Sequence, residues 1–402
     1  MNKSNDFRLK HPMIDSSRFS SGGVKAGLEG EIVCGSNLFP KIRDYISKFC
    51  VIEEAYIDLI TLWIMGTYIF PVFRYYPYLK IQAEKGSGKT TLLEVLAPIA
   101  FNGQMFVAPT ESVIFRFIEN NKATLLFDEV EYLKTENKDV YAAILSILNA
   151  GFNSEGVVIR NERIGDKFIP KKYSAYSPKI FCGIDSLDNV LADRAISVKL
   201  YRKKDTEVIE RYKATEELKK LQKEIRDELY IWALDNASKI AQLYQNGIVE
   251  KECIQHLSNR ELDIWEPLFI IAYLADDLKE FGLIESLKKL SEESSSSRIY
   301  DNICENQTCK LLFAIKMLVE EEKPLKKEGD MLTYKADDVL NYFNNKKLLN
   351  TYISSKYRLT SKLKTIDISS KQQRIGDYKG MVYLISKKSL EDLCERYQVL
   401  DN

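Results

Sequence analysis

The chain has 402 residues, of which 45% are hydrophobic and 29% are charged, an ordinary composition for a globular protein with enough material for two or three domains. Basic and acidic residues number 58 each, so any surface that binds nucleic acid must be a local patch. The seven cysteines and two histidines show no zinc-type spacing, which excludes a zinc-centred fold and favours a reduced, cytoplasmic protein over a disulfide scaffold.

The first part of the chain predicts a polar tail followed by helix. Residues 1–25 are rich in serine, asparagine and glycine and show no signal-peptide pattern. From Asn37 to Ile69 apolar residues recur at helical spacing. The charge-free run from Leu59 to Phe73 contains Gly66 and Pro71, and it is shorter than the roughly 18 residues that a membrane span needs. We therefore expect a buried core helix and no membrane association.

Residues 83–90, with the sequence Ala-Glu-Lys-Gly-Ser-Gly-Lys-Thr, join a predicted strand at Tyr78–Ala83 to a predicted helix at Thr90–Ala100. A glycine-rich turn in this position directs backbone N–H groups and a helix N-terminus at one anion. Lys89 would neutralise the β- and γ-phosphates of ATP, and Thr90 would ligate Mg²⁺. The residues that we assign to nucleotide binding here are Glu84, Lys85, Gly86, Ser87, Gly88, Lys89, Thr90 and Thr91.

A second motif follows where the apolar run Leu125–Phe127 ends in Asp128 and Glu129. We expect Asp128 to ligate Mg²⁺ together with Thr90, and Glu129 to act as the base that polarises water. The two motifs in this order predict a nucleotide triphosphatase. The alternative, a purely structural glycine turn between a core strand and a helix, accounts for the first motif but leaves the second unexplained.

Strand and helix signals alternate between residues 78 and 200, which predicts an α/β fold. Such alternation is typical of a mainly parallel sheet that is covered on both faces and binds its ligand at the carboxyl ends of the strands. Beyond the first strand and helix, the predicted elements are strands at Gln104–Ala108, Ala123–Asp128, Lys179–Ile184 and Ala195–Leu200 and helices at Ser112–Glu119 and Asp139–Ala150. Between the second of these helices and the strand at Lys179, residues 156–173 have two β-like arms around a polar turn and predict a hairpin.

The rest of the chain predicts a helical region and a small third unit. Residues 206–290 are helical in pattern, and the acidic and serine-rich run at 291–298 is a linker signal. The third unit, residues 299–402, has the order of a winged helix, three helices followed by a hairpin. Its predicted elements are helices at Lys310–Glu320, Ala336–Phe343 and Ser354–Lys364, β-like runs at Gln372–Ile375 and Gly380–Ile385, and a last helix at Ser389–Tyr397.

The third unit is locally basic. Between Leu340 and Lys388 there are 11 basic and two acidic residues, a net charge of +9. A solvated lysine-rich face would explain this charge, but a compact patch on a helix and its wing is better interpreted as a surface that contacts DNA phosphates. The residues that we assign to this contact are Lys356, Arg358, Lys362, Lys364, Arg374 and Lys379.

Together these motifs resemble the AAA+ ATPases of the primase/helicase type that bacterial mobile elements carry, including the MCM-like helicases of staphylococcal genomic islands and their phage relatives. The resemblance extends from about Gly27 to Tyr397. Besides the two nucleotide motifs, it rests on the segments at residues 110–119, 177–184, 191–196, 260–268, 378–380 and 395–397. It implies an AAA+ P-loop core at residues 26–205, a helical lid at 206–290, the linker at 291–298 and a winged-helix DNA-binding domain at 299–402.

The resemblance also implies a homo-oligomeric ring, usually a hexamer, with ATP between neighbouring subunits. Arg194, in the Ala-Asp-Arg-Ala sequence before a strand, would then be an arginine finger. Asp185, or the adjacent Ser186, falls at the position of the polar sensor residue of the family, and Arg260 is the lid candidate for contacting nucleotide. Simple ion pairing at the surface is the alternative for both arginines. Related helicases insert the hairpin into the ring channel to grip DNA, and the cations available for this are Arg160, Arg163, Lys167, Lys171 and Lys172. A plain surface hairpin is the alternative.

Three functional hypotheses follow. The first is an ATP-driven ring that moves on DNA or unwinds it during replication of a mobile element. The second is a DNA-bound ATPase switch, acting in phage defence or plasmid control without strand separation. A small-molecule kinase is the weakest, because it needs neither the Asp-Glu pair nor a basic C-terminal unit.

Overall fold

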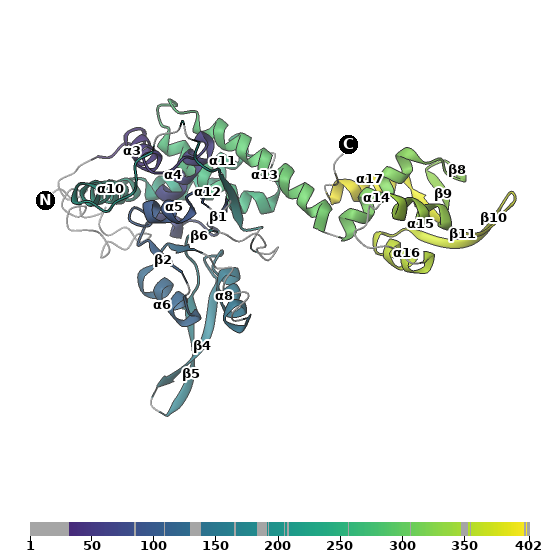
Figure 1. Ribbon diagram of the computed structural model, residues 1–402, viewed down its shortest axis with the longest axis horizontal. Coiled ribbons are helices and arrows are strands. Elements are labelled where there is room, and N and C mark those ends of the chain that lie inside the picture. The colour runs from purple at the N-terminus through teal and green to yellow at the C-terminus, as the bar shows by residue number, and fades with distance from the viewer. Residues whose placement is uncertain are drawn as a thin grey trace. The chain divides into compact units, whose positions relative to one another are not determined.

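A computed structural model describes the chain between residues 32 and 399, with the exception of residues 84–85, 108, 129–137, 165, 183–190, 192, 205, 207–208, 256, 306, 347–352, 354 and 398. The chain divides into two compact units with the boundary between Glu292 and Glu293 (Figure 1). Each unit has a hydrophobic core of its own. The predicted N-terminal tail, residues 1–25, lies outside the described residues.

The first unit is built on a five-stranded sheet in which every neighbouring pair of strands is parallel. Its strand order is β2-β3-β6-β1-β7. All the side chains of β3 and β6 are buried, although successive residues of a strand point to opposite faces. The sheet is therefore covered on both sides, and the prediction of an α/β fold with a parallel sheet is confirmed. The strands are β1 (Tyr78–Ala83), β2 (Gln104–Phe106), β3 (Leu125–Phe127), β6 (Lys179–Cys182) and β7 (Ala195–Leu200).

The helices between these strands are α5 (Lys89–Leu96), α6 (Glu111–Asn121) and α8 (Lys138–Ala150), and all three were predicted to within a few residues. Before β1, the single predicted helical segment is two helices, α3 (Gly35–Ser47) and α4 (Glu54–Thr67), followed by the short η2 (Phe70–Val72). The break contains the β-branched residues Val51 and Ile52, which lose side-chain freedom in a helix.

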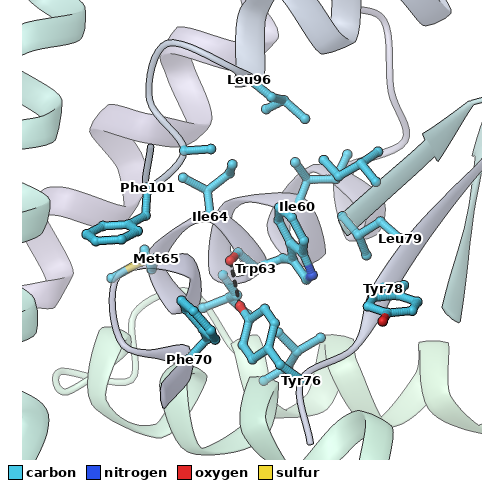
Figure 2. Packing of buried hydrophobic residues seen from close by; sticks show 14 of the residues in the cluster. Ile60, Trp63, Ile64, Met65, Phe70, Tyr76, Tyr78, Leu79, Leu96 and Phe101 are labelled. Atoms are coloured by element: carbon cyan, nitrogen blue, oxygen red, sulfur yellow. Dashed lines mark hydrogen bonds between the residues drawn. The ribbon is translucent and has the colours of Figure 1, made fainter. Parts of the chain in front are cut away.

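Helix α4 is a core helix, as predicted, because every residue from Leu59 to its end at Thr67 is buried. Burying Trp63 and Tyr76 requires partners for their polar atoms. The indole N–H of Trp63 donates to the carbonyl of Pro77 at 2.8 Å, and the Tyr76 hydroxyl donates to the carbonyl of Trp63 at 2.7 Å (Figure 2). The helix is thereby tied to the segment that leads into β1.

The predicted hairpin is formed by β4 (Val157–Ile164) and β5 (Lys167–Ser174), which pair antiparallel in a separate two-stranded sheet. It extends away from the rest of the first unit (Figure 1). At its base the ammonium group of the fully buried Lys179 donates to the carbonyls of Gly151, Ala175 and Ser177 at 3.3, 3.1 and 2.9 Å. Burial lowers the pKa of Lys179 well below its ordinary value. Because Lys179 is the first residue of β6, these hydrogen bonds link that strand to the base of the hairpin.

The first unit continues with the helices α10 (Glu216–Asn246), α11 (Ile248–Cys253), α12 (Asn259–Ala275) and α13 (Leu283–Glu305). Helix α12 begins at a capping box in which Ser258 and Glu261 satisfy each other's backbone N–H groups. The run predicted as a linker, residues 291–298, lies inside α13 and is helical, because Leu283, Leu287 and Leu290 keep one helical face buried up to that point. The boundary between the two units therefore falls within a helix.

Beyond the end of α13, the described part of the second unit has four α-helices and a four-stranded antiparallel sheet of order β10-β11-β9-β8. The sequence predicted the helices and the β10–β11 hairpin but missed β8 and β9. Strand β9 shows no alternation, since Leu332, Thr333 and Tyr334 are all buried, and the left-handed Gly329 was the available turn signal. The elements are α14 (Gln307–Glu321), β8 (Lys326–Glu328), β9 (Met331–Lys335), α15 (Ala336–Asn345), α16 (Lys356–Leu363), η3 (Lys364–Ile366), β10 (Ser369–Ile375), β11 (Tyr378–Ser386) and α17 (Lys387–Arg396).

Candidate functional site

A glycine turn, residues 86–88, connects the carboxyl end of β1 to α5. Gly86 and Gly88 have φ values of +84° and +86°, a region that other L-residues rarely adopt. A Cβ at either position would meet nothing within 4 Å, so backbone conformation alone requires glycine here. Gly88 is the N-cap of α5, and the first turn of that helix has backbone N–H groups without intrahelical partners. The turn therefore has the form of an anion-binding site. Glu84 and Lys85 lie outside the described residues.

The two sequence motifs meet at the carboxyl edge of the sheet. The hydroxyl Oγ1 of Thr90, in the first turn of α5, donates to Oδ2 of Asp128 at 2.8 Å. Asp128 directly follows β3 and is 7% exposed. Hydroxyl and carboxylate oxygens are the ligands that Mg²⁺ prefers in proteins, so this pair fits the predicted metal site.

Lys89 folds back over the glycine turn. Its Nζ donates to the carbonyl of Ala83, the last residue of β1, at 3.0 Å. Among the described residues the partner of this ammonium is thus a neutral carbonyl, which a more strongly attracting anion in the turn could replace. Glu129 lies outside the described residues.

A pocket of about 410 Å³ opens beside the glycine turn. Gly86, Gly88 and Thr91 line it together with a wall of aromatic side chains, Phe49, Tyr201 and Tyr212. The sequence analysis missed this wall, because its residues come from three separate segments and no spacing pattern links them.

Gln222 and Cys50 determine the position and the charge of side chains at this aromatic wall. Nε2 of Gln222 donates to the hydroxyls of Tyr45 and Tyr212 at 2.8 and 3.3 Å, which holds the Tyr212 ring in place. Burial raises the pKa of the Cys50 thiol, which also lines the pocket, to about 12, so this side chain is neutral. A pocket of this size, with an aromatic wall, the charged residues Lys203, Glu210 and Arg211 and a polar turn at one side, suits a flat heterocycle joined to an anionic group.

Arg194 and Arg260 both lie against the ring of Phe152. Their guanidinium carbons are 5.9 and 5.0 Å from its centroid. Arg194 Nη1 donates to the backbone and side-chain oxygens of Asn149, both at 2.7 Å, and Arg260 pairs with Asp263 at 3.4 Å. The structure therefore brings these two predicted site residues to the same aromatic ring.

This arginine pair is remote from the glycine turn. The backbone of Arg194 accepts a hydrogen bond from the N–H of Tyr78, the first residue of β1, whereas the turn follows the last residue of that strand. Strand β1 has six residues, or roughly 16 Å from first to last at the usual rise per strand residue. The two arginines thus belong to the amino edge of the sheet and the glycine turn to the carboxyl edge. Asp185, the third residue of this group, lies outside the described residues.

The hairpin cations differ in their partners. Arg160 pairs with Glu111, Arg163 with Asp166 at 3.6 Å and Lys171 with Glu162 at 3.4 Å. Within the part of the chain that the structure describes, Lys167 and Lys172 form no ion pair. Of the five cations predicted to contact DNA, these two carry positive charge that no described carboxylate offsets.

The predicted DNA-contact residues of the second unit also divide into two groups. Lys356 pairs with Asp337 at 3.1 Å, and Lys362 is half-buried. Arg358, Lys364, Arg374 and Lys379 are exposed.

Arg374 and Lys379 stand directly opposite each other near the tip of the β10–β11 hairpin, which we call the wing tip. Like charges in this arrangement destabilise a sheet. They share a sheet face with Tyr383, whose hydroxyl donates to the carbonyl of Lys356 in α16 at 2.9 Å. The wing-tip cations and α16 therefore lie on the same side of this sheet.

Comparisons with known proteins give little further information. A family described as a protein of unknown function (DUF3631) matches residues 199–397, just under half of the chain. No curated protein matches. A solved structure titled "SCCmec type IV Cch - active helicase" is similar at 11% identity and a TM-score of 0.32, over 98% of this chain and 72% of that one. Similarity at this level carries no argument about function.

Two further features are absent from the described residues. No helix among them is both long and apolar enough to cross a membrane. No three histidine, cysteine, aspartate or glutamate side chains in the described segments are grouped so that they could hold a metal ion.

Proposed function

We propose that this chain is an ATP-hydrolysing motor of the AAA+ type that assembles into a ring, acts on DNA and serves the replication of a mobile genetic element. The hydrogen bond between Thr90 and Asp128 carries the proposal, because it joins the helix that follows the glycine turn to the end of β3, which is separated from β1 by β6 in the sheet. A merely structural glycine turn would need no such pairing of a hydroxyl with a buried carboxylate.

Each part of the nucleotide has a matching group in this arrangement. The backbone N–H groups of the glycine turn and the ammonium of Lys89 would bind the phosphates. Thr90 and Asp128 would hold Mg²⁺, which supplies positive charge for the developing negative charge on the phosphates. The pocket lined by Phe49 and Tyr212 would take the adenine, and Glu129 would accept a proton from the attacking water.

The position of Arg194 supports the ring. An arginine at the amino edge of the sheet does not reach a nucleotide bound at the carboxyl edge of its own subunit. A second copy of the chain, packed edge to edge, would bring Arg194 and its neighbour Arg260 to the nucleotide of the first. Both arginines then act between subunits, and the site is incomplete in a single chain. We expect six subunits, as the resemblance of the sequence implies.

The DNA contacts that we propose come from two places, the hairpin β4–β5 and the face of the second unit that carries α16 and the wing tip. Lys167 and Lys172 in the hairpin, and Arg358, Arg374 and Lys379 in the second unit, offer exposed positive charge for phosphates.

Substitution of Lys89 tests the nucleotide site. Lys89→Ala should lower ATP turnover by about 100-fold or more, because it removes the ammonium beside the glycine turn that would neutralise the phosphates. Steady-state phosphate release and nucleotide affinity would be measured for both proteins. Lys239→Ala, which removes an exposed lysine from α10, is the control and should behave as wild type. Normal turnover in Lys89→Ala would refute the proposed site.

A forked-duplex assay then separates a motor from a switch. ATP-dependent strand separation that Lys89→Ala abolishes supports the motor. An enzyme that hydrolyses ATP and binds DNA, but leaves the fork intact, would instead be a DNA-bound switch.

A further inference from the structure

The two faces of the β4–β5 hairpin have different surroundings. On one face the ring of Tyr173 lies 4.6 Å from that of Phe115 in α6, and Arg160 pairs with Glu111 of the same helix. Glu162, also on this face, accepts a hydrogen bond from the Tyr173 hydroxyl, which holds the pKa of that carboxyl below its ordinary value. Helix α6 therefore covers the base of this face, whereas Ile169 and Lys171, nearer the tip, are exposed.

The other face, which we call the open face, is exposed. It comprises the alternate residues Val157, Ile159, Asn161 and Arg163 of β4 and their partners Ser174, Lys172, Pro170 and Phe168 of β5. Phe168 is 71% exposed, Ile159 53% and Val157 48%. Exposing several large apolar side chains on one strand pair is costly in water and marks a surface that meets a partner.

The pairing on the open face shows what kind of partner it fits. Phe168 lies directly across from Arg163, and Ile159 lies directly across from Lys172. Each cation thus stands beside an apolar side chain, so a suitable partner must present negative charge and flat apolar groups at short intervals. Single-stranded nucleic acid does this, whereas the bases of a duplex are stacked on one another and covered.

We propose that Phe168 stacks on a base of single-stranded nucleic acid while Arg163 and Lys172 contact the adjacent phosphates. The inference rests on the proposed function, which assigns DNA contact to this hairpin through its charges, and it adds contact with a base. The phenyl group of Phe168 is exposed near the tip of the hairpin, so it can reach a base without any movement of the core. Stacking does not depend on which base is present, as an oligomer that moves along DNA would require.

The test uses the full-length chain and two fluorescent oligonucleotides of equal length, one normal and one in which the central bases are replaced by abasic sites. Phe168→Ala should bind the normal strand about 5- to 100-fold more weakly than wild type. The salt dependence should stay unchanged, because no charge is removed. On the abasic strand the two proteins should bind equally. Phe168→Trp should restore binding to the normal strand.

Two further variants complete the design. Leu278→Ala removes an apolar side chain that is 63% exposed outside the hairpin, and it should bind both strands as wild type does. Lys172→Ala should weaken binding to both strands and lower the log–log salt slope by about 0.7.

Other results would overturn the inference in distinguishable ways. Equal weakening of Phe168→Ala on both strands would show that the ring only supports the hairpin. Loss of the oligomer in Phe168→Ala, measured by mass photometry, would assign the open face to a subunit interface. If wild type hydrolyses ATP but binds neither strand, the DNA-binding part of the proposed function fails together with this inference. If wild type binds the normal strand and Phe168→Ala binds it equally well, the stacking inference alone fails.

Discussion

Glu266 illustrates how burial changes the chemistry of one side chain outside the candidate site. It lies on α12, one turn after Asp263, and Glu250 of α11 is close enough to add its negative charge. Burial, with a smaller contribution from these two carboxylates, raises the pKa of Glu266 to about 7. In the unfolded chain the same group would titrate near its ordinary value of about 4.3.

This shift predicts a stability that depends on pH. Between about pH 4.3 and pH 7 the folded chain binds more protons at Glu266 than the unfolded chain does. The free energy of unfolding should therefore fall as the pH rises through this window. Glu266→Gln should remove this part of the dependence and be more stable than wild type at pH 8, as measured by urea unfolding at several pH values. Glu224→Gln, at an exposed position of α10, is the control and should leave the slope unchanged.

At the residue scale, features that depend on a few adjacent residues could be predicted from the sequence, whereas contacts between residues far apart in the chain could not. Gly86 and Gly88 are predictable because a left-handed turn is a property of a few adjacent residues. The placing of Arg194 and Arg260 against one ring depends on Phe152, which lies far from both in the chain. The prediction that Arg260 contacts the nucleotide stays a prediction.

At the scale of elements, periodicity predicted the long helices and the two exposed hairpins. It missed β8 and β9 of the second unit. Strand β9 shows no alternation, because its central residues Leu332, Thr333 and Tyr334 are buried on both faces of the sheet. The break between α3 and α4 was missed because apolar residues continue at helical spacing across it. The periodicity of apolar residues therefore predicts amphipathic elements best. The proposed DNA contacts lie on elements of this kind.

The wing tip provides a prediction at this scale. Arg374 and Lys379 oppose each other without a carboxylate partner among the described residues, so their repulsion costs stability that a bound phosphate would recover. Replacing both by Gln should raise the free energy of unfolding by about 0.2–1 kcal/mol. It should also weaken duplex DNA binding and lower the log–log salt slope by about 0.9 for each phosphate that the variant no longer binds.

The control replaces Lys223 and Lys239, two exposed lysines of α10, by Gln, which changes the net charge by the same amount. Stability would be followed by chemical unfolding and binding by fluorescence anisotropy at several salt concentrations. If the wing-tip variant and the control lose affinity equally, the net charge of the chain and not the wing governs binding.

At the scale of the whole molecule, the chain is two units that each bury their own core. The boundary between the units falls in the serine-rich and acidic run at residues 291–298, which offers little apolar surface for packing. The sequence did not predict that a helix continues through this run. The roles predicted for the two units, an ATPase and a winged-helix DNA-binding domain, remain predictions.

The ring itself can be tested by mixing two inactive variants. Lys89→Ala damages the glycine-turn side of the site and Arg194→Ala the opposite edge of the subunit, where the loss of an arginine finger lowers turnover by about 10³- to 10⁵-fold. Each variant alone should be inactive, while Arg194→Ala should still bind ATP. In a mixed ring, some interfaces place an intact glycine turn from an Arg194→Ala subunit against an intact Arg194 from a Lys89→Ala subunit. ATP turnover should therefore return in part on mixing.

A second mixture provides the matched control. Lys89→Ala and Asp128→Asn both damage the glycine-turn side, so every interface in their mixed ring contains at least one defect and turnover should stay at background. Native mass spectrometry would verify that both mixtures form mixed rings. Recovery in the first mixture and not in the second requires that the two edges of the sheet meet between subunits. If neither mixture recovers although mixed rings form, Arg194 does not act on the nucleotide of a neighbour, and its bonds to Asn149 only hold the subunit together.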